Sequence, residues 1–323
     1  MKTVFAGAAM LLGIVVAAGA NAAYPERPIT LVIGFTAGGP TDAVGRFLAR
    51  NLEKELGQTV VVENRAGANG VLALSAVKRA APDGYTLMLG SSGTLSVEPA
   101  YKKKVDYEVL KDFAPVGLVA TYPYLMVVPS NSPYRTVAEM IEGARARPGA
   151  LTFASAGSGA VNHLGGEWFA NGTRTQWTHV PYKGDSAAVN DLAAGRVDMA
   201  LLAVIVAQPQ IDGGKLRALA IGSPDTSPLA PQLPTVAQAA GIPGYAAAPW
   251  NGILAPAGVD PAIVTRLNQA INTVMSTDEA RRTLTTLGQF PFTGTPEDMA
   301  RQIREQTARW GQVIEQAAIA RAD

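Results

Sequence analysis

The chain has 323 residues, with 27 lysines and arginines, 26 aspartates and glutamates, two histidines and no cysteine. Its 48% hydrophobic content is too high for a disordered chain, and its balanced charge argues against electrostatic binding of nucleic acid. Without cysteine there are no disulfides, thiol nucleophiles, Cys-ligated zinc or lipid-modified N-terminal cysteine. The length favours two domains over one.

The first 22 residues have the pattern of a Sec-type signal peptide. Lys2 is the only charge before an apolar run at 4–18, and a small-residue cleavage site ends at Ala22. The alternative, an uncleaved membrane anchor, needs about 20 apolar residues, which is longer than this run. Cleavage removes Lys2 and no acid, so 27 minus 1 leaves 26 basic against 26 acidic side chains. The sequence therefore predicts an exported, soluble mature protein with no net charge.

Apolar runs alternate with helical patterns in the first part of the mature chain. A helix is expected where Val44, Leu48, Leu52 and Leu56 recur four apart and the pattern stops at Gly57. The expected elements are, in order, a strand at 29–35, a helix at 41–56, a strand at 59–63, a helix at 71–80 and a strand at 85–90. Strands separated by helices favour a parallel sheet covered on both faces.

The second part repeats this alternation. Thr136 and Glu139 form a capping-box pattern that predicts a helix ending before Pro148. The other expected elements are strands at 125–128, 151–154, 197–202 and 216–221, and a helix at 187–194 closed by Gly195. Loops around a short helix are expected at 223–249, then helices from 257 to the end, the last at 297–320. The fold class is therefore α/β, with two sheets.

Two loops join an expected strand to an expected helix and are rich in glycine. The first runs from Phe35 to Asp42, with Gly38 and Gly39 before Pro40. The second, at 155–163, contains serines and glycines. Free backbone N–H groups and the helix dipole favour an anion at such places. An ordinary turn or a flexible connection is the alternative for each loop, but two loops in two regions can face each other across a cleft.

Catalytic and metal-binding patterns are missing from the sequence. Ser92 and Ser158 lack the Gly-x-Ser-x-Gly pattern of a nucleophile elbow, and no phosphate-loop or complete dinucleotide fingerprint occurs. His163 and His179 have no metal-ligand spacing. Lys183 is interpreted as an exposed lysine or an anion contact, and Trp250 as a cleft wall or a packing residue. We therefore expect no catalytic residue, no metal and no cofactor.

The order of several motifs resembles the periplasmic receptors of tripartite tricarboxylate transporters, the Bug family. These motifs are Phe35-Thr-Ala-Gly-Gly with Asp42, Val62-Glu-Asn-Arg, Asp83-Gly-Tyr-Thr-Leu, Asp112-Phe-Ala-Pro-Val, Ser155 to His163-Leu, His179-Val-Pro-Tyr-Lys-Gly, Gly195-Arg-Val-Asp and Trp250-Asn-Gly. They extend through most of the mature chain, so together they are much more specific than any one of them.

The resemblance implies a two-lobed type II periplasmic-binding-protein fold with two mixed sheets and a hinge of two crossover strands. By analogy, lobe one comprises residues 24–122 and 250–323, and lobe two comprises 123–249. The ligand-binding residues that it implies, with weaker contacts last, are Phe35, Thr36, Ala37, Gly38, Gly39, Asp42, Ser155, Gly157, Ser158, Gly159, Asn162, His163, Ser92, Thr94, Tyr182 and Asp198.

The function implied is a periplasmic, monomeric receptor that closes on a small organic carboxylate and delivers it to membrane permease subunits. Dicarboxylates, tricarboxylates, amino acids and aromatic acids all remain open as ligands. Two other classes also remain: a ligand-sensing subunit of a membrane signalling kinase, which has the same fold, and a secreted hydrolase. Turnover of a carboxylate ester that Ser158→Ala abolishes would favour the hydrolase.

Overall fold

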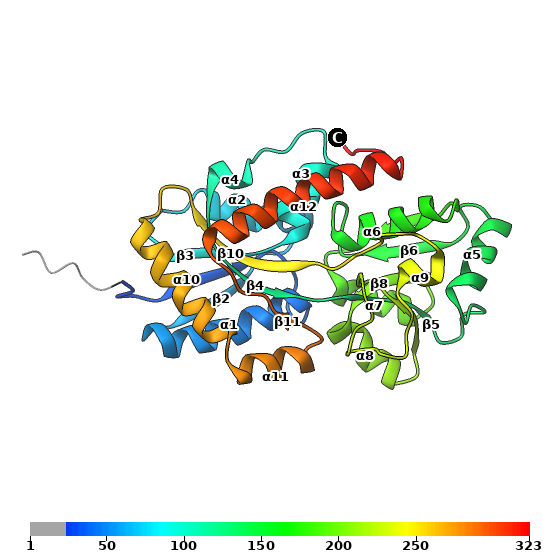
Figure 1. The fold of residues 1–323 in the computed structure, drawn as a ribbon, viewed down its shortest axis with the longest axis horizontal. Coiled ribbons are helices and arrows are strands. Elements are labelled where there is room, and N and C mark those ends of the chain that lie inside the picture. The colour runs from blue at the N-terminus through cyan, green and yellow to red at the C-terminus, as the bar shows by residue number, and fades with distance from the viewer. Residues whose placement is uncertain (1–23) are drawn as a thin grey trace, which may run out of the picture.

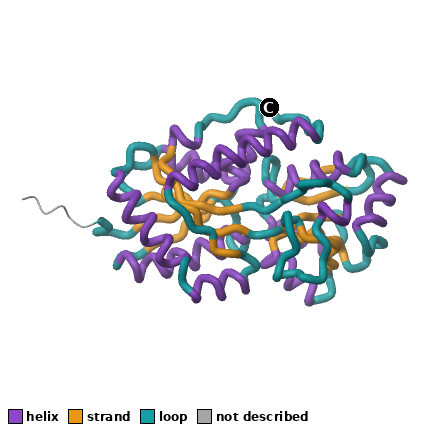
Figure 2. The backbone as a smooth tube through the Cα atoms, viewed as in Figure 1, coloured by secondary structure: helices purple, strands orange, loops and turns teal. Residues whose placement is uncertain are grey.

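The computed structural model describes residues 24–323 as two lobes, each built on one β-sheet with helices packed around it (Figure 1). The predicted signal peptide, residues 1–22, lies outside the described residues. In Figure 2 the strands gather into two groups, one per lobe. Among the described helices, none combines the length and apolar composition needed to span a membrane.

The first sheet has six strands in the order β11-β4-β10-β3-β1-β2. Strand β1 pairs in parallel with β2 and β3, whereas β10 is antiparallel to β3 and β4, and β11 is antiparallel to β4. Their bounds are β1 Ile29–Ile33, β2 Val60–Asn64, β3 Thr86–Ser91, β4 Phe113–Thr121, β10 Trp250–Pro256 and β11 Phe290–Pro291. The sheet is therefore mixed: the three strands expected to be parallel are parallel, and β4, β10 and β11 add antiparallel pairs.

Helices cover both faces of this sheet. Their bounds are α1 Pro40–Leu56, α2 Val71–Lys78, α3 Glu98–Tyr101, α4 Val109–Asp112, α10 Pro261–Met275, α11 Asp278–Thr286 and α12 Pro296–Gln316, with a 3₁₀ turn η1 at Ala68–Gly70 and a π-helical turn η2 at Gly93–Val97. The four apolar residues predicted for α1 are buried against β1 and α10. Each such fully buried aliphatic side chain contributes roughly 1.5–3 kcal/mol. Gly57 ends α1 at φ 71°, a conformation that suits glycine.

The second sheet has five strands in the order β7-β6-β8-β5-β9. Strand β6 is parallel to β7 and β8, and β5 is antiparallel to β8 and β9. The bounds are β5 Tyr124–Pro129, β6 Thr152–Ser155, β7 Thr178–Pro181, β8 Met199–Ala203 and β9 Leu216–Ile221; the helices are α5 Val137–Ala146, α6 Val161–Gly172, α7 Asp185–Ala193, α8 Val204–Asp212 and α9 Val236–Ala240. Every predicted strand and helix of this region is present.

The chain passes between the sheets twice. It crosses at Tyr122 and Pro123, between β4 and β5, and returns just before Trp250, where β10 begins. Trp250 itself is 2% exposed and packs in the first lobe's core. Two short connections of this kind position the sheets so that the ends of β1 and β6 face each other.

Helix α12 makes a further connection between the lobes. It begins over the first sheet and extends along the molecule toward α6 (Figure 1). Its Trp310 ring lies edge-on to Trp168 of α6, with ring centroids 6.1 Å apart. Val313 and Ile314 belong to the same buried cluster as Phe169 of the second lobe. The helix therefore packs on both lobes; its last turn ends at Gln316, not at the predicted residue 320.

The start of α12 gives a stability prediction. Thr295 accepts a hydrogen bond from the Asp298 amide at 3.1 Å, and Asp298 accepts one from the Thr295 amide at 2.9 Å. Thr295→Ala should lower the free energy of unfolding by about 1 kcal/mol, because it leaves a first-turn amide without its acceptor. Chemical denaturation would measure it. The exposed Thr293→Ala serves as control, and equal effects of the two substitutions would contradict the capping role.

Candidate functional site

The first glycine-rich loop lies between β1 and α1. Gly39 precedes α1 with an extended backbone, and Pro40 occupies the first helical position. Gly38 has φ 80°, a backbone conformation that favours glycine. The side-chain amide of the buried Gln289 donates to the carbonyl of Pro40 at 2.8 Å. This hydrogen bond holds the end of the loop. The first amides of α1 have no acceptor within the helix and point out of its N-terminus.

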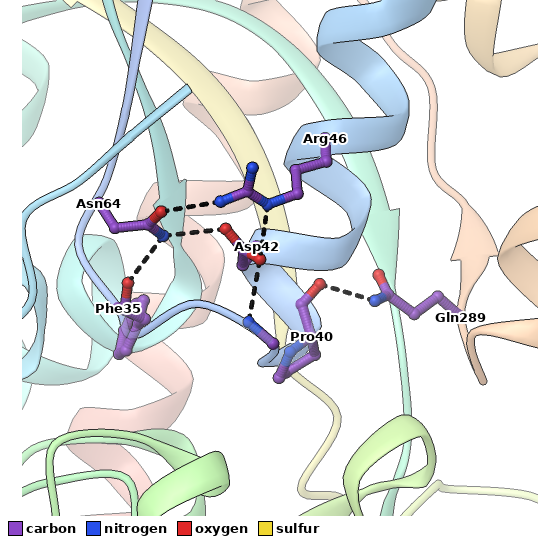
Figure 3. Close-up of polar contacts among 7 residues, drawn as sticks. Phe35, Pro40, Asp42, Arg46, Asn64 and Gln289 are labelled. Atoms are coloured by element: carbon purple, nitrogen blue, oxygen red, sulfur yellow. Dashed lines mark hydrogen bonds and ion pairs between the residues drawn. The ribbon is translucent and has the colours of Figure 1, made fainter. Parts of the chain in front are cut away.

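The Asp42 carboxylate fixes this loop by hydrogen bonds (Figure 3). Its Oδ2 accepts hydrogen bonds from the Gly38 amide and from Arg46 Nε, both at 2.9 Å, and its Oδ1 accepts from Asn64 Nδ2 at 2.9 Å. Asn64 also donates to the Phe35 carbonyl at 3.1 Å. Burial alone would raise the pKa of Asp42, but the bonds from Arg46, Gly38 and Asn64 lower it below its usual value. Asp42 is therefore an ionised positioning residue whose oxygens are already used.

The second loop lies between β6 and α6. Beside it, the buried His163 of α6 stacks on the half-buried His179 of β7. Ser155 Oγ lies 2.6 Å from His179 Nε2, and the ring centroids of His179 and His163 are 4.0 Å apart in a stacked arrangement. The Gly159 amide donates to His163 Nδ1 at 3.1 Å, so this nitrogen is the unprotonated one. Burial lowers the pKa of His163 to about 3, helped by His179, and lowers that of His179 to about 4. Both imidazoles are neutral near pH 7.

The two loops line one cavity of about 30 Å³ between the lobes. Its lining residues are Phe35, Thr36, Gly39, Pro40, Thr41, Asn69, Ser91, Gly93, Tyr122, Tyr124, Ala156, Ala160, Val161, Gly184, Asp185 and Pro249. The lobes touch beside it, where Thr36 Oγ1 donates to the Lys183 carbonyl at 3.5 Å. The enclosed space is thus formed by segments far apart in the sequence.

Three helices begin at this cavity: α1, α6 and α7. Within residues 24–323, no side chain caps the N-terminus of any of the three. Unpaired first-turn amides and the positive end of each helix dipole stabilise negative charge, typically by 0.3–1 kcal/mol for each helix at an exposed site. Because the three starts come from both lobes, an anion bound between them would contact both.

A larger cavity of about 260 Å³ adjoins the first and shares Phe35, Asn69 and Ala156 with it. We call the first the inner cavity and the larger one the outer cavity. Its other lining residues are Gly34, Gly67, Ala68, Glu98, Lys102, Gly157, Ser158, Pro181, Tyr182 and Lys183. At this outer end Lys102 Nζ lies 3.6 Å from Glu98 Oε1, and Lys183 adds a second cationic side chain. The two cavities together form a path from the surface to the helix starts.

The site residues predicted from the sequence either line a cavity, are exposed in a loop, or form hydrogen bonds within the protein. Those that line a cavity are Phe35, Thr36, Gly39, Gly157, Ser158 and Tyr182. Ala37 and Gly38 are exposed in the first loop, and Gly159 faces Glu98 of the other lobe closely. Those whose polar atoms bond within the protein are Asp42, Ser92, Thr94, Ser155, Asn162, His163 and Asp198. Within the described chain, none of these hydrogen-bonded residues lines either cavity. Their bonds fix the surrounding backbone, as where Asp198 accepts from Thr152.

Among the polar lining residues that sequence reasoning missed are Asn69, Tyr122, Tyr124 and Asp185. Asp185 follows Gly184 and lies two residues before the predicted helix at 187–194, which was a usable signal. The other three come from a 3₁₀ turn and from the crossing between the sheets, which carry no motif. Asn69 has φ 51°, so it adopts the left-handed region in which asparagine is more common than most residues.

Asp185 is the one carboxyl group that lines the inner cavity among the described residues. Its Oδ1 accepts from Asn162 Nδ2 at 2.9 Å, and its Oδ2 accepts from the Ala203 amide at 3.3 Å. Burial raises its pKa to about 7, and these two bonds only partly oppose that effect. Its charge therefore has no cationic partner within the protein as described.

Comparisons with known proteins decide the family. A model described as "Tripartite tricarboxylate transporter family receptor" matches residues 44–319. The chain belongs to this family. It is 40% identical over 292 residues to a protein from the tcbD-tcbE intergenic region of Pseudomonas sp. strain P51, covering 90% of this chain and 87% of that protein. It is 38% identical over 292 residues to BugT of Bordetella pertussis, covering 90% and 89%.

Solved structures give the same answer for the fold. The R. palustris protein Rpa4515 with adipate matches at TM-score 0.88 and 36% identity, over 92% of this chain and 99% of that one. MatC from Rhodopseudomonas palustris with bound malate matches at TM-score 0.85 and 33% identity, over 90% and 100%. The predicted two-lobed periplasmic-binding-protein fold with two mixed sheets is therefore confirmed, and so is the family resemblance.

The histidine pair gives a pH prediction. Because each pKa is lowered, the folded state should not bind protons at these rings until about pH 4 or below, whereas the unfolded chain binds them below about pH 6.5. The pair therefore contributes stability that is present above about pH 6.5 and is lost as the pH falls. NMR titration of the imidazole signals from pH 8 to 5 should show neither ring titrating. A midpoint near 6.5 for either would contradict its burial.

Proposed function

We propose that this receptor is exported, binds a small organic carboxylate between its two lobes, and presents it to the permease subunits of a tripartite tricarboxylate-type transporter. The observation that carries this proposal is the meeting of three helix N-termini from both lobes at one enclosed cavity. Backbone amides at such ends bind carboxylates without a basic side chain. The nearly neutral composition of the chain agrees with this mode of binding.

The mechanism follows from the positions of the loops. The carboxylate binds the first amides of α1, where Gly39 lets it approach the backbone, and Asp42 keeps the loop in place through Gly38 and Asn64. Lobe one, residues 24–122 and 250–323, and lobe two, residues 123–249, then rotate about the two crossings and close. The closed form is what the permease recognises.

Relatives support the ligand class. Structures of family members with adipate and with malate contain small dicarboxylic acids, so carboxylates of this size are the first ligands to test. The proposed contacts are the lining residues of the two cavities, while Asn162, His163 and Ser155 hold the second loop in shape. The site performs binding without chemistry, and the receptor is a periplasmic monomer after removal of residues 1–22.

Ligand binding is tested with the mature chain from Ala23 onward. A thermal-shift panel of mono-, di- and tricarboxylates, amino acids and aromatic acids should give at least one stabilising ligand, since a ligand at 100 times its Kd adds about 2.7 kcal/mol. Calorimetry on that ligand then gives the Kd, and product analysis checks that it is recovered unchanged. Absence of any stabilising carboxylate, or turnover of the ligand, would contradict the proposal.

The first loop is tested by Gly39→Val. A Cβ at this position meets only Ser186 Oγ and the Thr36 carbonyl, each at 3.5 Å, so the fold tolerates it, while the branched side chain fills the space beside the helix start. We expect Kd to rise at least tenfold, measured by calorimetry, with little change in stability. Gly311→Val in α12, where a Cβ meets no atom of the described chain within 4 Å, is the control. Unchanged affinity in Gly39→Val would place the ligand elsewhere.

A further inference from the structure

The inner cavity has two ends of opposite character. At one end the first loop presents the uncapped start of α1 through Gly39 and Thr41. At the other end, in the second lobe, the start of α7 carries the carboxyl group of Asp185. Asp185 already accepts from the Ala203 amide and from Asn162, so the anion of this lobe is supplied by the protein itself.

The lining of the cavity contains nothing that balances this carboxyl group. Among the described residues that line the inner cavity, none is a lysine, arginine or histidine. Lys102 and Lys183 line only the outer cavity. The tyrosines Tyr122 and Tyr124, which do line the inner cavity, are buried neutral rings near Asp185. A second carboxylate on the ligand would therefore meet a like charge at short range, which is unfavourable in a buried site.

A second hydrogen-bond acceptor in the same cavity, on Asn69, also favours a ligand that carries a donor group. Asn69 is 6% exposed and lines both cavities, and its Oδ1 has no hydrogen-bond partner among the described residues. Its Nδ2 donates to Glu98 Oε2 at 2.9 Å, and this bond fixes which way the amide faces. A buried acceptor without a donor costs about 1–3 kcal/mol, which a donor group of the ligand would recover.

We infer that Asp185 is a specificity-determining residue that selects carboxylates whose opposite end carries a hydrogen-bond donor, above all an ammonium group, against carboxylates that end in a second carboxylate. The ligand class is then a short amino acid that bridges the two lobes, with its carboxylate at α1 and its ammonium at Asp185. This inference rests on the proposed function, and narrows its ligand class.

The burial of Asp185 also supports a cationic group on the ligand. The pKa of Asp185 is raised to about 7 by its removal from water. A cation beside the carboxyl group would favour its charged form, so ligand ammonium and Asp185 stabilise each other. No residue of the described chain supplies such a cation to Asp185.

The experiment compares acids that share a chain length and differ only at the far end. Calorimetry at pH 7.5 measures 4-aminobutanoate against glutarate, and 3-aminopropanoate against succinate. The wild-type protein should bind each amino acid at least tenfold more tightly than its paired diacid. Asp185→Asn, and Asp185→Ser as a smaller second variant, should reduce this ratio at least tenfold and improve diacid binding.

Asp212→Asn is the matched control, because it removes one negative charge from the exposed end of α8 in the same lobe. Its ratio should equal that of the wild type. Tighter binding of the diacids by the wild type, with the same ratio in both Asp185 variants, would overturn the inference and leave the carboxylate receptor intact. Failure of both ligand classes and of the whole carboxylate panel would contradict the receptor function as well.

Discussion

Helix starts that lack side-chain caps are the constraint on which this site depends. Each α-helix leaves its first amides without an intrahelical partner, and a buried amide without an acceptor is costly. In this receptor the starts of α1, α6 and α7 lie around one cavity. Asp185, at the start of α7, accepts instead from the Ala203 amide at the end of β8, and we propose that a ligand carboxylate satisfies the start of α1.

The rest of the first lobe keeps that unsatisfied end rigid. The oxygens of Asp42 already accept hydrogen bonds from Gly38, Arg46 and Asn64, so this residue fixes the loop at which we propose that the ligand binds. Asn64 lies at the end of β2 and Arg46 on the second turn of α1, so the loop is tied to two elements of the core. Rigid presentation of backbone amides lets an almost neutral chain bind an anion.

Local sequence patterns predicted the elements that depend on local physics. The spacing of Val44 to Leu56 and the glycine at 57 identify α1, and β9 matches its predicted residues 216–221 because only Arg217 interrupts its apolar run. Strands β4 and β10 were missed because their Pro115, Gly117 and Gly252 are unfavourable in strands, and pairing with each other and with β3 and β11 keeps them extended. Both glycine-rich loops were identified as candidate sites, whereas Asp185 and Asn69 were not: the position of Asp185 just before a predicted helix was overlooked, and Asn69 lies in a 3₁₀ turn that carries no motif.

The contact between α12 and the second lobe changes what an empty receptor should do. Trp310 and Trp168 pack together and neither lines either cavity, so this part of the attraction between the lobes involves no ligand atom. Closed molecules without cargo should then form a measurable fraction of the population. A permease that recognises the closed form would then also meet closed receptors without cargo. The C-terminal helix would set how often these unloaded receptors compete for the transporter.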